Sequence, residues 1–133
     1  MMRIGLILAG GRATRLGGAD KGLVPFQGEP LALRAYRRLS PQVDRILVSA
    51  NRSFDEYRKV LPPDTELIPD RTDSFPGPLA GLEAAIASLP EESRKETWLF
   101  TVPCDCPFFP SDLTEKLIFA ANAAGARSAI AEA

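Results

Sequence analysis

A glycine-rich basic segment near the start of the chain holds the residue types that bind phosphate groups. It follows an apolar run and consists of Leu8-Ala9-Gly10-Gly11-Arg12-Ala13-Thr14-Arg15-Leu16-Gly17-Gly18-Ala19-Asp20-Lys21. Glycines let backbone N–H groups approach a ligand closely because they lack a Cβ, and the arginines and the lysine add positive charge. A buried strand that ends in such a loop indicates a cradle for a nucleoside triphosphate. The spacing matches neither a Walker A loop nor a dinucleotide fingerprint, and a surface loop with incidental charges is the alternative.

A carboxylate, Asp105, stands in a comparable position later in the chain. It follows an apolar run and lies between Pro103 and Pro107, which restrict the turn around it. A carboxylate at the end of a strand is a hard oxygen ligand, which Mg²⁺ takes together with phosphate oxygens. The alternative is an aspartate that caps a turn or the next helix. We favour the metal, and we expect Arg15 and Lys21 to face Asp105 across a shared triphosphate.

Two further polar side chains are less specific. Asp70 follows a short apolar run, and it could form a turn, pair with Arg71, bind a guanine edge or share the metal. Asn51 could bind a base or ribose, or form an Asx turn. Other basic residues are expected on solvated helix faces, namely Arg34, Arg37, Arg38 and Lys59.

The composition excludes several classes of chemistry and of partner. The 133 residues include no histidine, which rules out His-based triads and His-ligated metals. Cys104 and Cys106 are too few for a zinc site and too close for an ordinary disulfide, so we expect reduced thiols. The net charge of −1 argues against nonspecific binding to nucleic acid or to an anionic membrane. No apolar run is long enough to span a membrane, and a cytoplasmic location is expected.

Strand and helix patterns alternate along the chain. Strands are predicted at 3–8, 45–49, 66–68, 97–102 and 127–130, and helices at 31–39, 53–60, 79–89 and 111–123. Ser53, with Glu56 in a capping box, and Ser111 are the predicted N-caps, and 97–102 is predicted to be a central strand because it is almost continuously apolar. The order predicts an α/β fold, a three-layer Rossmann-like, mostly parallel sheet with helices on both faces, in a single domain over 1–133. Ligands bind beyond the carboxyl ends of such strands, so the polar loops that follow the first four strands should converge.

Four motifs, in order, resemble the molybdenum cofactor guanylyltransferases. They are Leu8-Ala9-Gly10-Gly11-x-x-x-Arg15-Leu16-Gly17-Gly18-x-Asp20-Lys21-Gly22, Ala50-Asn51-Arg52, Pro76-Gly77-Pro78-Leu79-Ala80-Gly81 and Pro103-Cys104-Asp105-x-Pro107. The resemblance implies a nucleotide-diphospho-sugar transferase-like fold. It also implies transfer of GMP from GTP onto the molybdopterin form of the molybdenum cofactor, with Mg²⁺ and release of pyrophosphate.

The resemblance also assigns roles to individual residues. Leu8, Ala9, Gly10 and Asp70 would contact the guanine nucleotide, Lys21 its phosphates and Asp105 the metal. Together with Arg15, whose charge would offset that of the phosphates, Lys21 and Asp105 form the expected catalytic set. The expected nucleotide-binding set is Leu8, Ala9, Gly10, Gly11, Lys21, Asn51, Asp70 and Asp105. Ser49 stands where the family often has Asn. Because the serine side chain is shorter, the contact that the Asn would make at this position is in question.

Alternative functions remain open at this level. A cytidylyltransferase for the same cofactor and a sugar-1-phosphate nucleotidyltransferase share parts of the pattern, although Gly10 and the 17–21 segment favour guanine and the molybdopterin branch. A GTP-binding module without turnover is the third alternative. It is raised by the family's greater length, because the C-terminal part that carries much of the acceptor pocket in that family lies outside this sequence, as expected of a fragment, a shortened paralogue or a protein that completes itself by association. We therefore expect an unfinished sheet that favours homo-oligomers, with molybdoenzymes or cofactor-delivery proteins as partners.

Overall fold

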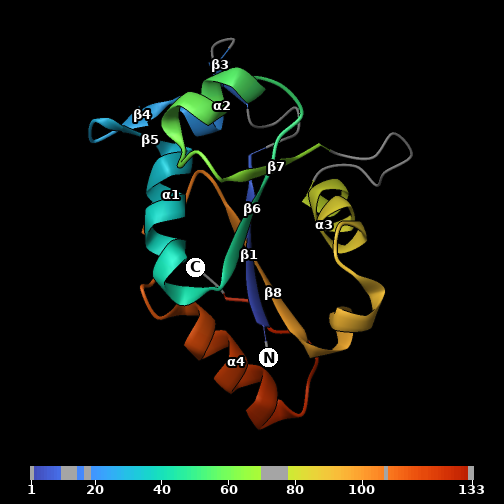
Figure 1. Cartoon of the computed structure of the whole chain (residues 1–133). Coiled ribbons are helices and arrows are strands. Elements are labelled where there is room, and N and C mark those ends of the chain that lie inside the picture. The colour runs from blue at the N-terminus through green and yellow to red at the C-terminus, as the bar shows by residue number, and fades with distance from the viewer. Residues whose placement is uncertain (1, 10–14, 17–18, 70–77, 107, 132–133) are drawn as a thin grey trace.

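A parallel four-stranded sheet forms the centre of the molecule (Figure 1). The computed structural model describes residues 2–9, 15–16, 19–69, 78–106 and 108–131, of which 15, 16, 19 and 78 are described for their backbone. The strand order is β7 (Glu66–Ile68), β6 (Arg45–Ser49), β1 (Met2–Leu8) and β8 (Thr97–Pro103). All pairs in it are parallel, which confirms the predicted α/β class.

Helices cover both faces of this sheet. The helices α1 (Leu31–Leu39), α2 (Phe54–Val60) and α4 (Leu113–Ala124) contribute to the hydrophobic cluster on one face, and α3 (Pro78–Ala87) contributes to the cluster on the other (Figure 1). In the described segments, these elements are connected by the short 3₁₀ helices η2 (Lys21–Leu23), η3 (Ser40–Gln42) and η4 (Glu91–Glu96). Two small antiparallel hairpins lie beside the carboxyl ends of the strands, β2 (Arg15–Leu16) with β3 (Ala19–Asp20) and β4 (Pro25–Phe26) with β5 (Glu29–Pro30).

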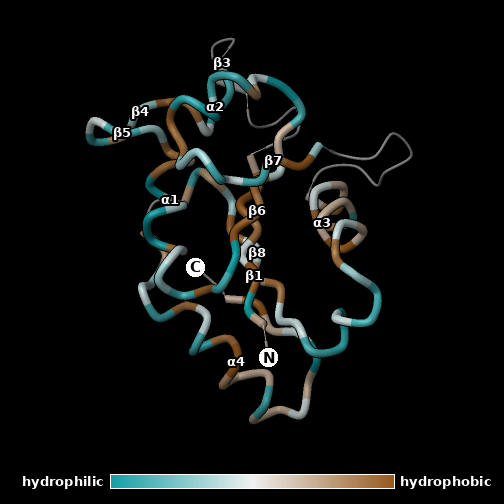
Figure 2. Tube along the Cα trace, viewed as in Figure 1, coloured by the Kyte–Doolittle hydropathy of each residue, from teal (hydrophilic) through white to brown (hydrophobic). Residues whose placement is uncertain are grey.

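The alternation of side chains along β1 divides the core into two clusters. Ile7 and Ala9 belong to the cluster under α1, and Ile4 and Leu6 belong to the cluster under α3. Successive side chains of a strand point to opposite faces, so one apolar strand serves both clusters. Hydrophobic residues accordingly gather along the central strands (Figure 2). Burial of apolar side chains on both faces, at about 25 cal/mol per Å², is the main force that holds the layers together.

The structure corrects the predicted position of one strand and the prediction of a fifth strand. The strand over 97–102 is β8, which lies at the edge of the described sheet instead of its centre. Phe100 and Val102 are buried on one face of β8, whereas Thr101 and Pro103 on the other face are exposed. Its apolar residues are thus buried by packing on a face of the sheet, which does not require a neighbouring strand on each side. No strand forms over 127–130 in the described chain, where Ile130 is 89% exposed. The residues next to this segment in the sequence are small, and no described strand pairs with it.

Both predicted helix caps are also corrected. Ser53 stands at the N-cap of α2, but its backbone is left-handed, with φ of 60°, and its side chain makes no capping hydrogen bond. A capping hydroxyl needs an extended backbone, which explains the loss. Helix α4 begins after Asp112 instead of Ser111, and the Asp112 side chain makes no capping bond either. The Asp112 carboxylate lies 3.5 Å from Lys116 Nζ, one turn into the helix.

Candidate functional site

The carboxyl ends of the strands line up at one edge of the sheet. Leu8 is in register with Ser49 of β6 and with Pro103 of β8, and Ser49 is in register with Ile68 of β7. The pairing continues one residue further, since Ala9 N–H donates to Ser49 O at 2.9 Å. The loops that leave these strands therefore start side by side, as the sequence predicted.

Lys21 and Asp105 meet at this edge. Lys21 Nζ donates to Asp105 Oδ2 at 2.9 Å, and the two side chains are 31% and 40% exposed. The hydrogen bond to Asp105, together with the negative charge of that carboxylate, raises the pKa of Lys21 above its usual range. The predicted approach of the basic turn to the acidic turn is thus confirmed for Lys21. Arg15 is described only in its backbone, which pairs with Asp20 in the β2–β3 hairpin.

A buried ion pair fixes the turn that carries Lys21. The Asp20 carboxylate is almost completely buried and accepts a hydrogen bond from Arg52 Nε, which connects β3 to the loop after β6. A buried carboxylate is tolerated when it is paired in this way. Sequence reasoning missed the pair, because nothing in the sequence links positions 20 and 52.

Close packing beneath η2 defines the position of Lys21 further. A Cβ added to Gly22 would lie 2.6 Å from the hydroxyl oxygen of Tyr57 and 3.3 Å from Ala32 Cβ. Glycine is therefore required for α1 and α2 to approach the turn this closely. The Tyr57 hydroxyl is buried without a hydrogen-bond partner among the described residues, and burial raises the pKa of this phenol.

The turn that carries Asp105 begins directly at the end of β8. Cys106 N–H donates to Pro103 O at 3.3 Å, and Cys106 Sγ lies 3.9 Å from Asp105 Oδ1. Cys104 is buried and Cys106 is exposed, and the structure has both as free cysteines. Burial raises the pKa of Cys104 to about 11 and also raises that of Cys106.

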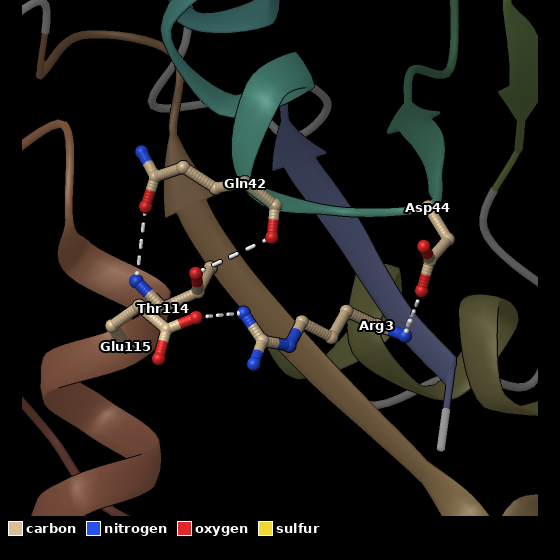
Figure 3. Close-up of polar contacts among 5 residues, drawn as sticks. All are labelled: Arg3, Gln42, Asp44, Thr114 and Glu115. Carbon is tan, nitrogen blue, oxygen red and sulfur yellow. Dashed lines mark hydrogen bonds and ion pairs between the residues drawn. The ribbon is translucent and has the colours of Figure 1, made fainter.

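Gln42 anchors the other end of this loop, and Figure 3 shows its contacts with Thr114 of α4. Its Nε2 donates to Pro110 O at 3.1 Å, and its Oε1 accepts from the backbone N–H of Thr114 at 3.0 Å. Gln42 thus satisfies an N-terminal amide of α4 that a capping side chain would otherwise take. Figure 3 also shows Arg3 joining the same region, through an ion pair with Glu115 of α4 and a backbone hydrogen bond to Asp44 Oδ2 at 2.8 Å.

The other predicted nucleotide-binding residues have varied positions. Leu8 is half-buried on the α3 side, Ala9 is buried on the α1 side, and Asn51 is exposed just after β6. Gly10, Gly11 and Asp70 lie outside the described residues.

Helix α3 approaches the strand ends at Gly81. A Cβ added there would lie 2.7 Å from Ser49 Oγ and 2.9 Å from Leu8 Cδ2. The missing side chain lets the helix approach β1 and β6 closely at the edge where the polar loops begin.

Arg34 is a functional candidate that sequence reasoning assigned wrongly. It was expected on a solvated helix face, but it is half-buried, with its guanidinium over the rings of Phe26 and Phe108. Arg38 is also half-buried and lies over Phe109, whereas Arg37 and Lys59 are exposed as expected. Helical periodicity places Arg34 beside the apolar residues of α1, but it does not show that two aromatic rings come from other segments.

A groove of about 880 Å³ follows the outer edge of β8. It is lined by this strand, by apolar residues of α3 and α4 and by residues 127–131, and it reaches the Asp105 turn at Cys106 and Phe108.

Within the described ranges, no cluster of three or more acidic or cysteine residues is arranged to hold a metal ion. The described helices also include none with the length and apolarity needed to cross a membrane.

The fold and the site define an α/β protein of the Rossmann-like class whose charged groups meet at the carboxyl edge of a parallel sheet. More narrowly, the chain belongs to the family of the MobA-like NTP transferase domain, whose model matches residues 5–133. It is 48% identical over 128 residues to a molybdenum cofactor guanylyltransferase of Burkholderia ambifaria, a match that covers 96% of this chain and 60% of that protein. A molybdenum cofactor guanylyltransferase of Cupriavidus taiwanensis is 45% identical over 127 residues, covering 95% of this chain and 59% of that protein. The chain thus spans about 60% of the length of the curated relatives it matches.

Solved structures support the fold independently of close sequence similarity. A CMP:2-keto-3-deoxy-manno-octonic acid synthetase, solved in complex with CTP, superposes with a TM-score of 0.71 at 17% identity. The superposition covers 95% of this chain and 49% of that one.

Proposed function

We propose that this chain provides the nucleotide-binding and transfer site of a molybdenum cofactor guanylyltransferase. In this reaction GMP passes from GTP to the terminal phosphate of a molybdopterin-type acceptor, and pyrophosphate is released. The observation that carries the proposal is the contact of Lys21 with Asp105 at the carboxyl edge of the sheet. Membership in the MobA-like family and the names of the two relatives support the choice of guanine and of the acceptor.

The chemistry suits the residues that are present. An oxygen of the acceptor phosphate forms a bond to the α-phosphorus of GTP, and the bond from that phosphorus to the pyrophosphate oxygen breaks. Such a displacement needs no nucleophile from the protein, which agrees with a chain without histidine. Catalysis then consists of positioning and of charge stabilisation, in which Lys21 and Arg15 offset the charge on the phosphates.

The carboxylate of Asp105 is suited to be a protein ligand of a magnesium ion. It is a partly exposed carboxylate at a strand end, and the contact made by its Oδ1 within the described residues is a thiol 3.9 Å away. Magnesium commonly takes one or two carboxylates and completes its shell with phosphate oxygens and water. When bound, the ion would neutralise phosphate charge and orient the triphosphate.

Titration with nucleotides tests the proposal. The chain should bind Mg²⁺·GTP more tightly than Mg²⁺·CTP by calorimetry, and Asp105→Ala should remove the dependence on Mg²⁺. Lys21→Ala should lower the rate of transfer on the order of a hundredfold. Lys59→Ala removes an exposed lysine of α2 and serves as the control, with no change expected. A preference for CTP would instead favour the cytidylyltransferase.

A second assay separates transfer from binding alone. Pyrophosphate release is measured with GTP and the molybdopterin-bound cofactor as acceptor, and release above the rate of the Asp105→Ala variant is expected. Tight binding of GTP without release would favour a binding module that does not turn over.

The proposal includes a homo-oligomer, supported by the edge position of β8, and molybdoenzymes or cofactor-delivery proteins as partners.

A further inference from the structure

A second cationic side chain, Arg34, lies beside the site, where three segments of the chain meet. Arg34 of α1 has its Cζ 5.2 Å from the ring centroid of Phe26 and 6.0 Å from that of Phe108. The two rings also contact each other, with centroids 5.4 Å apart and an interplanar angle of 77°. Arg34 therefore lies against an edge-to-face aromatic pair, an arrangement in which the rings attract the cation.

The segments that meet here are the same ones that meet at Lys21 and Asp105. Phe26, in β4, follows Lys21 by five positions, and Phe108 follows Asp105 by three. The two contacts are thus successive points along one junction. Helix α1 is joined to the first segment by the hydrogen bond from Leu31 N–H to Val24 O at 3.0 Å. This bond holds the first turn of α1, and with it Arg34, beside the junction.

The charge of Arg34 is not compensated within the described part of the chain. It makes no ion pair and no hydrogen bond there, and its Nε is buried without a partner. Arg37, one turn further along α1, differs, since its Nη1 lies 2.7 Å from Glu29 Oε1. A buried polar group without a partner requires an explanation. A guanidinium that lies against aromatic rings and has no carboxylate beside it can bind an anion through its remaining N–H groups.

We propose that Arg34 binds a phosphate group of a ligand of this site, with Phe26 and Phe108 holding the guanidinium in place. A planar guanidinium suits two phosphate oxygens at once, and contact with the two rings restricts its position before the ligand arrives. Phe108 is 61% exposed, so the aromatic pair lies at the surface, where a ligand can approach it. The inference rests on the proposed function for the identity of the phosphate, which belongs either to the nucleotide or to the acceptor.

Inorganic phosphate is the first probe, because it needs no assumption about the nucleotide. The Nε–H resonance of Arg34, assigned by its absence in Arg34→Lys, should shift and saturate when phosphate is added to the ¹⁵N-labelled chain. Arg34→Gln should weaken phosphate binding at least tenfold. The matched control is Arg37→Gln, which removes the same charge from the same helix and should change the affinity less than twofold. Equal affinity in Arg34→Gln and the unaltered chain, or an equal loss in both variants, would overturn the proposal.

A second variant preserves the test if Arg34→Gln does not fold. Phe108→Leu changes a largely exposed ring, and it should keep the thermal unfolding temperature while weakening phosphate binding about threefold. Unchanged phosphate affinity in a folded Phe108→Leu protein would contradict the role assigned to the rings.

Titration of Arg34→Gln with Mg²⁺·GTP then identifies the source of the phosphate. A loss of GTP affinity equal to the loss of phosphate affinity assigns the group to the triphosphate. Unchanged GTP affinity, with a raised KM for the acceptor in the pyrophosphate assay, assigns it to the acceptor. Failure of the proposed function would give a different result from failure of the Arg34 proposal. A chain that binds phosphate through Arg34 but does not bind Mg²⁺·GTP would refute guanylyl transfer and leave the role of Arg34 intact.

Discussion

Lys21 Nζ lies 2.9 Å from Asp105 Oδ2, although 84 positions separate the two residues in the chain. The contact joins the turn after β3 to the turn after β8. Because both side chains are partly exposed to water, the pair contributes little to stability, and either partner can exchange the other for a ligand at low cost. This combination of closeness and exposure suits a site that binds a phosphate and a cation together.

Neutralising Asp105 should make the Lys21 amine more reactive. The hydrogen bond to Asp105 raises the pKa of Lys21, so Asp105→Asn should lower that pKa and increase the unprotonated fraction at pH 9. Acylation rates measured by mass spectrometry should rise at Lys21 and stay constant at Lys59, which is exposed on α2. Equal rates at Lys21 in both proteins would show that the contact does not persist in solution.

Gly22 and Tyr57 should show a strong energetic coupling. Gly22→Ala places a methyl group against the Tyr57 hydroxyl and should destabilise the protein by about 1–3 kcal/mol. Tyr57→Phe removes that hydroxyl, which has no partner among the described residues, and should change stability by less than about 1 kcal/mol.

The double variant Gly22→Ala/Tyr57→Phe should recover part of the loss. Urea unfolding of the four proteins gives the coupling free energy directly. Strict additivity would mean that the methyl group and the hydroxyl do not compete for the same space.

Gln42 should contribute to stability through the loop that carries Asp105. Gln42→Leu leaves Pro110 O and the Thr114 N–H without their partner, and it should cost about 2 kcal/mol in the free energy of unfolding. Thr114→Val removes one long bond, from Thr114 Oγ1 to Gln42 O at 3.3 Å, and should cost about 0.5 kcal/mol. Denaturant midpoints measured at equal m-value test this order, and a larger loss in Thr114→Val would reverse the assignment.

The two cysteines should differ in reactivity, and Cys104 should give stability a dependence on alkaline pH. Iodoacetamide should modify the exposed Cys106 in the folded protein and should reach Cys104 only on unfolding. Burial raises the pKa of Cys104 from 9.0 to about 11, so the unfolded chain binds fewer protons than the folded one between these values. Stability should therefore fall as the pH rises through this window, by about 1 kcal/mol per pH unit.

Cys104→Ala separates this effect from other alkaline titrations. The decline in stability between pH 9 and 11 should be smaller in this variant than in the unaltered chain. A decline of the same slope in both proteins would assign the effect to other groups.

Local patterns were sufficient to predict most of the elements. The helix over 31–39 and the strands over 45–49 and 66–68 have the predicted bounds, because apolar spacing and nearby prolines are properties of the neighbouring sequence. The predicted cap of α4 failed for the opposite reason. The N–H of Thr114 is satisfied by Gln42, 72 positions away, so a suitable residue beside the helix was not needed.

The amino-acid sequence by itself determined the alternation of strands and helices, and with it the edge of the sheet at which the polar loops gather. It did so because the period of the apolar residues fixes which face of each element is buried. Tertiary structure alone decided that β8 is an edge strand, that Asp20 pairs with Arg52 and that Arg34 lies against a pair of aromatic rings. These relationships join segments far apart in the chain, and they depend on how the layers pack rather than on the preferences of any one segment.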